Sequence, residues 1–549
     1  MKKLPTILLL SALLLQGCAD FGTDYPERGE NTGESYAEAA PQWAELPVIR
    51  WEESDYYSEY KDGVFIDLEA LSSGSGYTAE NSVITITEEG TYVLTGTLSE
   101  GRVVVDAKKS DHVRLVLDNT SIHCTDASPI EVKKAERVTV SLPEGTENNL
   151  SNGAGVDYEN TDIAGILSKC SLVINGSGRL TVSASSGDGI RSKDTLRLTG
   201  GVITVSAADR GFIGKDSVEI KDVEADISSV GDGIRSNNDE DSALGYVYIE
   251  GGDIRISTED DGISAEGRVM ICGGSVEIAE SLEGIEGKAV DISGGVIRVK
   301  ASDDGLNATD GTGDMVGMFS QNRDDEAADV YIRITGGDVF VDALGDGVDS
   351  NGIVALDGGT LVVMGPDNGA NGYMDTAGTF SINGGVYMGV GTSAMLVVPA
   401  SSSSQQSFVW SANAFYDGGS IVEIRDGEGA TLFSRETVRR FNSITFSSLE
   451  LAAETEYFVY INDEQVAAVK AGTASGGTGS FGGFGGNRGG RGERPEMPQG
   501  GFGGTPPEMP NRGEFETREG DTMPPMPEGG FGGGMPTDGT RPEMPPYGK

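Results

Sequence analysis

The sequence predicts an all-β protein built mainly from a right-handed parallel β-helix, a solenoid with about 22 residues in each coil. Three observations predict this fold. Short runs rich in β-branched residues alternate with turns from about residue 80 onward, an Asp-Gly-Ile motif recurs at a nearly constant interval, and Gly-Gly pairs recur at the same interval. No long helical period competes with these runs.

The first residues have the layout of an export signal. A basic start precedes an apolar run from Ile7 to Leu15, which is too short to cross a bilayer as a helix. The run closes with Leu15-Gln16-Gly17-Cys18, which resembles a bacterial lipobox. We therefore expect residues 1–17 to be a lipoprotein signal peptide and Cys18 to carry a lipid that holds the exported protein at the outer surface of the cell membrane. The alternative is a plain signal peptide with an incidental cysteine.

Composition divides the rest of the chain into four parts. Residues 18–75 are polar and acidic, and we expect a tether followed by a partly packed lead-in segment. The parallel β-helix is expected over 76–400. Over 401–472 the period fades while β-type runs persist, which predicts a small β domain that caps the open end of the solenoid. Residues 473–549 are rich in Gly, Pro and Met and have little apolar surface to offset ordering entropy, so we expect a disordered tail.

The repeat is defined by two columns of motifs. The Asp-Gly-Ile column consists of Asp188-Gly189-Ile190, Arg210-Gly211-Phe212, Asp232-Gly233-Ile234, Asp261-Gly262-Ile263, Glu283-Gly284-Ile285, Asp304-Gly305-Leu306 and Asp346-Gly347-Val348. Their residue numbers differ by 22, 22, 29, 22, 21 and 42, so two intervals contain insertions. The Gly-Gly column keeps the same pace at 200–201, 251–252, 273–274, 294–295, 336–337 and 358–359. A propeller blade would need about 40 residues, so one coil of a β-helix fits better.

The side-chain pattern predicts which positions face inward. After each Gly-Gly pair, apolar residues alternate with polar ones, as in Ile203/Val205 and Ile254/Ile256. In the Asp-Gly-Ile column the residue two after the acidic position is apolar and the residue four after it is small. We expect both to face inward, and the acidic position itself to face solvent. Stacked coils would then bury apolar ladders that a single coil could not bury alone.

A formal charge of -47 argues against nucleic acid as a partner and in favour of cations, or of polymers reached through bridging cations. The two histidines have no neighbouring ligand cluster, so no zinc site is predicted. Apart from Cys18, the cysteines are Cys124, Cys170 and Cys272, which we interpret as small apolar residues of the coil.

The acidic positions predict a calcium site. In the N-terminal half of the repeat Arg210 lies between Asp188 and Asp232, so this half can neutralise itself. In the C-terminal half the predicted metal ligands are Asp261, Glu283, Glu286, Asp304, Asp346 and Asp349. Like charges one coil apart repel by about 1 kcal/mol in water and roughly 4 kcal/mol at an effective dielectric near 20. Calcium relieves such repulsion because it accepts six to eight oxygen ligands in flexible geometry. The alternative is a solvated acidic face without a discrete site.

Basic residues near these acids predict an anionic ligand. The candidates for binding uronate carboxylates of an extracellular polysaccharide are Arg191, Lys193, Lys215, Arg235 and Lys288. Stacked strands offer a long face that suits an extended polymer. The alternative is that each basic residue is half of a structural ion pair.

Several motifs together resemble one family. They are the lipobox, Thr-Tyr-Val-Leu-Thr-Gly-Thr-Leu at 91–98, Leu117-Asp118-Asn119-Thr120-Ser121-Ile122, the Asp-Gly-Ile coils and the Phe-Gly-Gly and Pro-Glu-Met units of the tail. Over roughly residues 60–470 the chain resembles the carbohydrate-binding domain-containing β-helix family of bacterial surface proteins, which is similar in fold to pectate lyases. The resemblance implies a calcium-containing parallel β-helix that binds plant cell-wall polymers such as cellulose or pectin.

Four functions follow from these features. The favoured one is non-catalytic binding of cellulose or of pectin and polygalacturonate, by a monomer that contacts the membrane only through its lipid. The second is a calcium-dependent lyase with Lys288 as base, although the neighbouring Glu266, Glu283 and Glu286 would raise the pKa of that lysine. The third is an inverting hydrolase using Asp260 and Asp261 or Asp303 and Asp304. The fourth is an envelope spacer or adhesin.

Overall fold

The computed structural model describes Trp43 and residues 47–60, 62–156, 162–310, 329–472 and 474–476. These residues are almost entirely β, and the one helical element among them is the 3-10 turn η1 (Glu53–Asp55). In the described part of the chain we find no helix that is both long and apolar enough to cross a bilayer. The predicted signal peptide, Cys18 and nearly all of the predicted tail lie outside the described residues.

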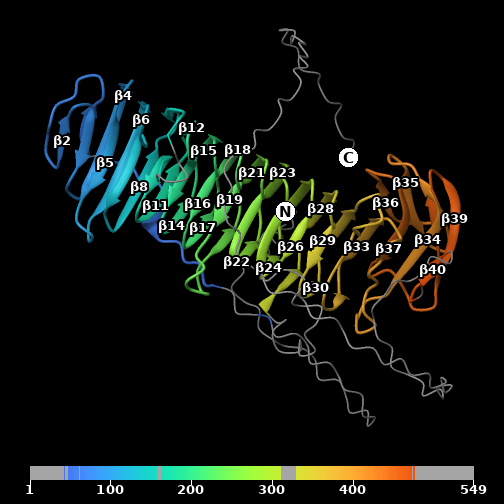
Figure 1. Ribbon diagram of the computed structural model, residues 1–549. Coiled ribbons are helices and arrows are strands. Elements are labelled where there is room, and N and C mark those ends of the chain that lie inside the picture. The colour runs from blue at the N-terminus through green and yellow to red at the C-terminus, as the bar shows by residue number, and fades with distance from the viewer. Residues whose placement is uncertain are drawn as a thin grey trace, which may run out of the picture. The chain divides into compact units, whose positions relative to one another are not determined.

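Most strands belong to one large sheet, in which most pairs are parallel and the parallel strands form three columns (Figure 1). The first column carries the Asp-Gly-Ile motifs and contains β3 (Val83–Ile86), β5 (Arg102–Asp106), β7 (Ile130–Lys134), β10 (Ala164–Ser168), β13 (Asp188–Ser192), β16 (Phe212–Gly214), β19 (Ile234–Ser236), the first parts of β22 (Ile263–Ile271) and β24 (Ile285–Ile292), β26 (Leu306–Ala308) and β29 (Val348–Ser350).

The second column contains β1 (Val64–Asp67), β4 (Gly90–Leu98), β6 (His112–Cys124), β8 (Arg137–Leu142), β11 (Ser171–Gly176), β14 (Thr195–Leu198), β17 (Ser217–Ile220), β20 (Tyr246–Ile249), the last parts of β22 and β24, β27 (Tyr331–Ile334), β30 (Ile353–Leu356) and β32 (Phe380–Ile382). The parallel stack therefore begins at β1, earlier than the expected residue 76.

The third column follows the Gly-Gly pairs. It contains the end of β6, β9 (Glu147–Asn152), β12 (Arg179–Ala184), β15 (Val202–Ala207), β18 (Glu224–Ser229), β21 (Asp253–Thr258), β23 (Ser275–Glu280), β25 (Val296–Ala301), β28 (Asp338–Ala343), β31 (Thr360–Met364) and β33 (Val386–Gly391). Successive coils add strands to these columns, as in a β-helix or solenoid.

The register confirms the predicted inward positions. Pairing aligns Ile190 with Phe212, Ile234, Ile263, Ile285, Leu306 and Val348 in one ladder, and every member of it is fully buried. In the third column Ile203 and Val205 are also buried, as are their equivalents in the following coils. The apolar ladders supply the main stabilisation of the stack because burying each aliphatic side chain contributes about 1.5–3 kcal/mol.

Two kinds of glycine maintain the coil. A Cβ atom on Gly284 would overlap the Gly305 carbonyl oxygen and the Val299 Cγ1 atom, so neighbouring coils approach too closely there for any side chain. Gly201 has a φ of 99°, a conformation that only glycine adopts readily, and it makes the corner before the third column.

Antiparallel strands end the stack at both ends. At the N-terminal end β2 (Tyr77–Glu80) pairs antiparallel with β3. At the other end β37 (Phe441–Ser447) pairs antiparallel with β33 and with β34 (Ser407–Tyr416). A separate antiparallel sheet consists of β36 (Thr431–Glu436), β35 (Ile421–Arg425), β38 (Glu456–Ile461) and β39 (Glu464–Lys470). Three residues of the expected tail form β40 (Ala474–Gly476), which pairs with β34.

The described part of the expected tether lies against the second column. We call Trp43 and residues 47–60 the strap. Trp43 meets the Tyr331 ring edge-on at 4.9 Å, and the Trp51 indole nitrogen donates to Glu250 at 2.6 Å. Farther along, the Ser58 hydroxyl accepts a hydrogen bond from Arg114 at 3.1 Å. The strap therefore runs along the stack from β27 to β6 and contacts coils that do not contact one another.

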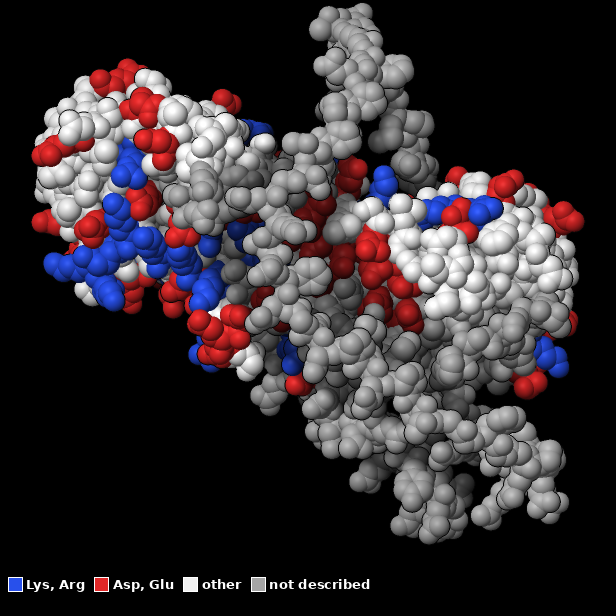
Figure 2. Space-filling view, viewed as in Figure 1, with Lys and Arg blue, Asp and Glu red and all other residues white. Residues whose placement is uncertain are grey.

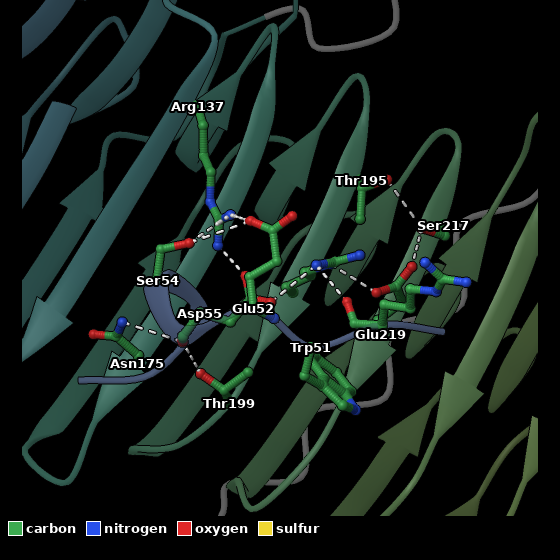
Figure 3. Close-up of polar contacts among 12 residues, drawn as sticks. Trp51, Glu52, Ser54, Asp55, Arg137, Asn175, Thr195, Thr199, Ser217 and Glu219 are labelled. Carbon is green, nitrogen blue, oxygen red and sulfur yellow. Dashed lines mark hydrogen bonds and ion pairs between the residues drawn. The ribbon is translucent and has the colours of Figure 1, made fainter. Parts of the chain in front are cut away.

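Asp55 fixes the middle of the strap (Figure 3). Its carboxylate is completely buried and pairs with Arg137 and, at 3.0 Å, with Arg197. Its carbonyl oxygen accepts hydrogen bonds from Asn175 and Thr199. These partners lie on β8, β11 and β14 and just after β14, so one residue of the strap joins three successive coils.

Candidate functional site

The residues that precede the glycines of the first column stack directly on one another. The Gly262 amide donates to the Glu283 carbonyl, Gly284 to Asp304 and Gly305 to Asp346, each at 2.9 Å. We call this set the acid column: Asp188, Arg210, Asp232, Asp261, Glu283, Asp304 and Asp346. The prediction that successive coils place these residues in register is confirmed. Figure 2 shows acidic side chains gathered near the middle of the view.

The acid column is more buried than we predicted. Asp188 is 1 %, Asp232 2 % and Asp261 8 % exposed, so the expectation that this position faces solvent was wrong. The reason is that the carboxylates fold onto the neighbouring coil. Asp304 Oδ1 accepts a hydrogen bond from the Asp346 amide, and Asp346 Oδ1 accepts one from the Gly372 amide, both at 2.6 Å.

Burial changes the protonation of these acids. Burial, a hydrogen bond with Glu286 and the charges of Asp232, Glu286 and Glu283 raise the pKa of Asp261 to about 9. Burial raises the pKa of Asp346 to about 7 and that of Asp304 to about 6, and neighbouring carboxylates add to both shifts. Asp261 therefore favours its protonated form at neutral pH unless a cation is bound.

The N-terminal half of the column neutralises itself, as predicted. Asp188 lies between Arg191 and Arg210, with an N–O distance of 3.0 Å to each. Asp232 Oδ2 pairs with Arg235, also at 3.0 Å. In this half the column is a chain of ion pairs.

In the C-terminal half of the acid column, the acidic side chains outnumber the basic side chains that could pair with them. The ligand oxygens of Asp261, Glu283 and Glu286 all lie within 4.8 Å of one another, and so do those of Asp232, Asp260 and Asp261. Asp261 belongs to both triads. Asp232 Oδ1 is buried and has no hydrogen-bond partner among the described residues. Both triads contain only carboxylate oxygens, which are the ligands that a hard divalent cation such as calcium prefers.

The structure brings together only part of the predicted ligand set. Asp261, Glu283 and Glu286 form one triad, while Asp304 and Asp346 occupy the next two positions of the column. Asp349 pairs in register with Asn307. Among the described residues, none of these last three acids joins a triad.

Sequence reasoning missed Asp232 and Asp260 as members of a triad. Asp232 was assigned to the self-neutralising half because Arg210 lies between it and Asp188, yet its ion pair is with Arg235 and involves only one of its two oxygens. Asp260 was treated only as half of a hydrolase pair. The signal that could have found it is the recurrence of an acid directly before the acid column.

Three of the five predicted basic residues meet at one hollow. The hollow has a volume of about 250 Å³ and is lined by Arg191, Ser192, Lys193, Ile213, Lys215 and Asn237. Arg191 and Lys193 both pair with Asp162, and Lys215 pairs with Glu240 at 3.2 Å. The partners Asp162 and Glu240 are themselves exposed at the surface.

The other two basic residues lie away from the hollow. Arg235 pairs with Asp232 and, at 3.1 Å, with Glu266, and the Lys288 ammonium lies 3.6 Å from Asp329. All five candidates therefore form ion pairs, as the structural alternative predicted. For Arg191, Lys193 and Lys215 this role is compatible with ligand binding, because an incoming carboxylate can replace an exposed partner.

Comparison with known proteins identifies the family. A family model described as "Carbohydrate-binding domain-containing protein" matches residues 80–317. A protein of the same description from Acetivibrio thermocellus is 32% identical over 259 residues, which cover 46% of this chain and 82% of that protein. This chain belongs to the carbohydrate-binding domain-containing protein family. A solved structure described as a polysaccharide lyase-like protein from C. thermocellum, a gadolinium derivative, is 34% identical, covers 40% of this chain and 90% of that one, and has a TM-score of 0.38.

The family match includes only part of the molecule. It spans the hollow and the acid column from Asp188 to Asp304. The strap, Asp346 and the antiparallel strands after β33 lie outside it. The carbohydrate-binding family is therefore represented here by the coils that carry the triads.

Proposed function

We propose that this protein binds an acidic extracellular polysaccharide of the pectin class, without cleaving it, through calcium held by the acid column. The observation that carries the proposal is the pair of triads that share Asp261. Family membership supports a carbohydrate ligand in general. Beyond family membership, we propose that the bound cation is calcium and that the polymer contains uronate residues. The proposal also includes the right-handed winding of the coils that the repeat predicts.

The triads fit calcium on two grounds. Their donors are oxygen atoms only, and Asp232 Oδ1 is a buried acceptor that has no hydrogen-bond partner among the described residues. The residues that would hold calcium are Asp261, Glu283 and Glu286, with Asp232 and Asp260 beside them. A bound calcium would neutralise the crowded carboxylates and offer open coordination positions to carboxylates of the polymer.

The hollow supplies direct recognition of a carboxylate. Arg191, Lys193 and Lys215 line it, and a uronate that displaces their exposed partners Asp162 and Glu240 would pair with them. A guanidinium and two ammonium groups around one hollow form charge-assisted hydrogen bonds with a planar carboxylate. The hollow lies on the coils of Asp188, Arg210 and Asp232, and the last of these coils also contributes Asp232 to a triad, so one polymer chain can contact both.

Binding without cleavage is proposed because the candidate base does not face the hollow. Lys288 is absent from the residues that line it and pairs instead with Asp329. The position of the protein at the outer surface of the membrane, through a lipid on Cys18, is part of the same proposal and rests on the leader sequence alone.

Affinity electrophoresis in gels that contain polygalacturonate, cellulose derivatives or a neutral glucan tests the function. We expect retention by polygalacturonate with calcium, loss of retention with a chelator, and at least about a tenfold weaker affinity for the variant Asp261→Asn, because a buried charge-assisted contact is typically stronger than 1.4 kcal/mol. Absorbance of unsaturated products, followed in the same mixtures, should stay flat.

The matched control is Asp226→Asn on β18, which changes an exposed acid of the third column. It should bind like the unmodified protein. Retention that is independent of calcium, or equal in the two variants, would contradict the calcium part of the proposal. Absence of retention by any polymer would contradict polysaccharide binding itself.

A further inference from the structure

A second column of residues runs directly beside the acid column. The Gly231 amide donates to the Asp209 carbonyl at 3.0 Å, Leu282 to Asp260 at 2.8 Å, and Asp303 to Leu282 and Gly345 to Asp303 at 2.9 Å each. We call this set the rim column: Asp209, Gly231, Asp260, Leu282, Asp303 and Gly345. Each member immediately precedes a member of the acid column in the sequence, so the two columns run side by side along the stack of coils.

The rim column has a period of two coils. Asp209, Asp260 and Asp303 lie on alternate coils, and glycine or leucine occupies the coils between them. The intervening coils each present one exposed apolar side chain. Val230 is 50 %, Leu282 42 % and Leu344 49 % exposed, although most aliphatic residues of the coils are fully buried. Acidic and apolar coils therefore alternate along this edge.

The glycines keep the carboxylates accessible. A Cβ atom on Gly231 would come within 2.7 Å of Asp209 Oδ1. A Cβ atom on Gly345 would overlap the Oδ1 atoms of both Asp303 and Asp304. The Oδ1 atoms of Asp209 and Asp303 thus lie over the glycines of the next coils, where a larger residue would displace them.

The two-coil period of the rim column matches the repeat length of an extended polysaccharide. Neighbouring parallel strands are about 4.8 Å apart, so two coils advance by roughly 9.6 Å, which is comparable to the length of one disaccharide in an extended pyranose chain. In a chain with a two-fold screw, successive rings are turned over, so every second ring presents the same edge. Alternate rings would then place a carboxylate toward an acidic coil and an apolar C–H face toward an apolar coil.

We propose that a linear uronate polymer lies along the stacking direction over the rim column, with one disaccharide for every two coils. This inference rests on the proposed function. Cations at Asp260/Asp261 and at Asp303/Asp304 would hold carboxylates of the polymer, and Val230, Leu282 and Leu344 would contact ring faces. A second observation supports a ligand at the first of these positions, because the buried Asp232 Oδ1 beside Asp260 and Asp261 has no partner among the described residues.

Calorimetric titration with oligogalacturonides of defined length, in calcium, tests the inference. The proteins are the full chain, the variant Leu282→Ser, and the control Leu449→Ser, which removes an exposed leucine outside the coils. We expect affinity to rise in steps of two sugar residues. Leu282→Ser should weaken binding of a hexamer roughly fivefold to tenfold while leaving calcium affinity unchanged, because only the apolar contact is lost.

The outcomes distinguish a failure of the two-coil register from a failure of the proposed function. If affinity rises smoothly with every added sugar, or if Leu282→Ser binds the hexamer as well as Leu449→Ser does, the two-coil register is wrong although polymer binding stands. If the unmodified protein binds no oligogalacturonide, the proposed function fails and the register fails with it.

Discussion

Replacing Asp55 by alanine is expected to release the strap from the second column. The carboxylate is completely buried between Arg137 and Arg197, and its loss leaves two largely buried guanidinium groups short of a partner. Removing one member of a buried ion pair typically costs about 3–5 kcal/mol. Hydrogen exchange of the amides in residues 47–60 should therefore accelerate by about two to three orders of magnitude, since each 1.4 kcal/mol is tenfold.

The control is Glu53→Ala, which removes an exposed acid of the same 3-10 turn. Its effect should stay within about 0.5 kcal/mol, as for most surface substitutions. Equal exchange in the two variants would show that the Asp55 ion pairs do not hold the strap. Because the strap joins coils that otherwise contact only their neighbours, we also expect Asp55→Ala to broaden the thermal unfolding transition.

The second large effect is expected from Gly284→Ala. The new Cβ would overlap the Gly305 carbonyl oxygen, which is backbone, and the Val299 side chain, which belongs to the buried third-column ladder. Relief requires moving a coil and stretching the 2.9 Å hydrogen bond from the Gly284 amide to Asp304. Overpacking of this kind costs about 1–3 kcal/mol, and more where backbone must shift. The melting temperature should fall by several degrees.

Gly427→Ala is the matched comparison, since a Cβ atom there would meet nothing within 4 Å. This variant should melt within about 1 °C of the unmodified protein, in keeping with small surface effects. If Gly284→Ala melts equally high, the close approach of successive coils at the Asp-Gly-Ile motif is not as the structure shows it.

The coil itself could be predicted because each repeat contains, close together in the sequence, the residues that determine its conformation. Ile190, Ile234 and Ile263 recur at the same distance from a glycine, and each lies in the buried ladder that this spacing predicts. Periodicity fixes register when one face must be buried, since a slip by one residue would expose the whole ladder.

The strap could not be predicted from the same signals. Asp55 and Arg197 are separated by 142 residues, and no repeat or local propensity links them. For residues 18–75 the composition predicted only a tether and a partly packed lead-in segment. Contacts of this kind depend on the complete coil stack, which presents Arg137 and Arg197 on one side of successive strands.

The candidate site was predicted in part. The spacing of the repeat correctly predicted that Asp261, Glu283 and Glu286 lie close together. Asp261 and Glu283 belong to the acid column, and Glu286 lies on β24, which pairs in register with β22. Strand alternation failed to predict their burial, because the acid column lies at a corner where the side chains fold over the next coil. The rim column could have been found in the sequence, because the residue directly before each acidic position alternates between aspartate and glycine or leucine.

The central claim is that the acid column holds a divalent cation. Without one, the raised pKa values of Asp261, Asp346 and Asp304 mean that the folded state retains protons that the unfolded chain releases near pH 3.8. The stability that these three groups contribute is therefore fully present below that pH and falls as pH rises toward about 9, the folded pKa of Asp261. Calcium would take the place of these protons, so its stabilising effect should grow with pH.

The most direct measurement is the melting temperature in millimolar calcium, compared with sodium chloride at the same ionic strength, at about pH 8 and about pH 5. We predict that calcium raises the melting temperature by at least about 5 °C more than sodium at the higher pH, and by much less at the lower pH. Equal shifts with the two salts at the higher pH would contradict a cation site in the acid column.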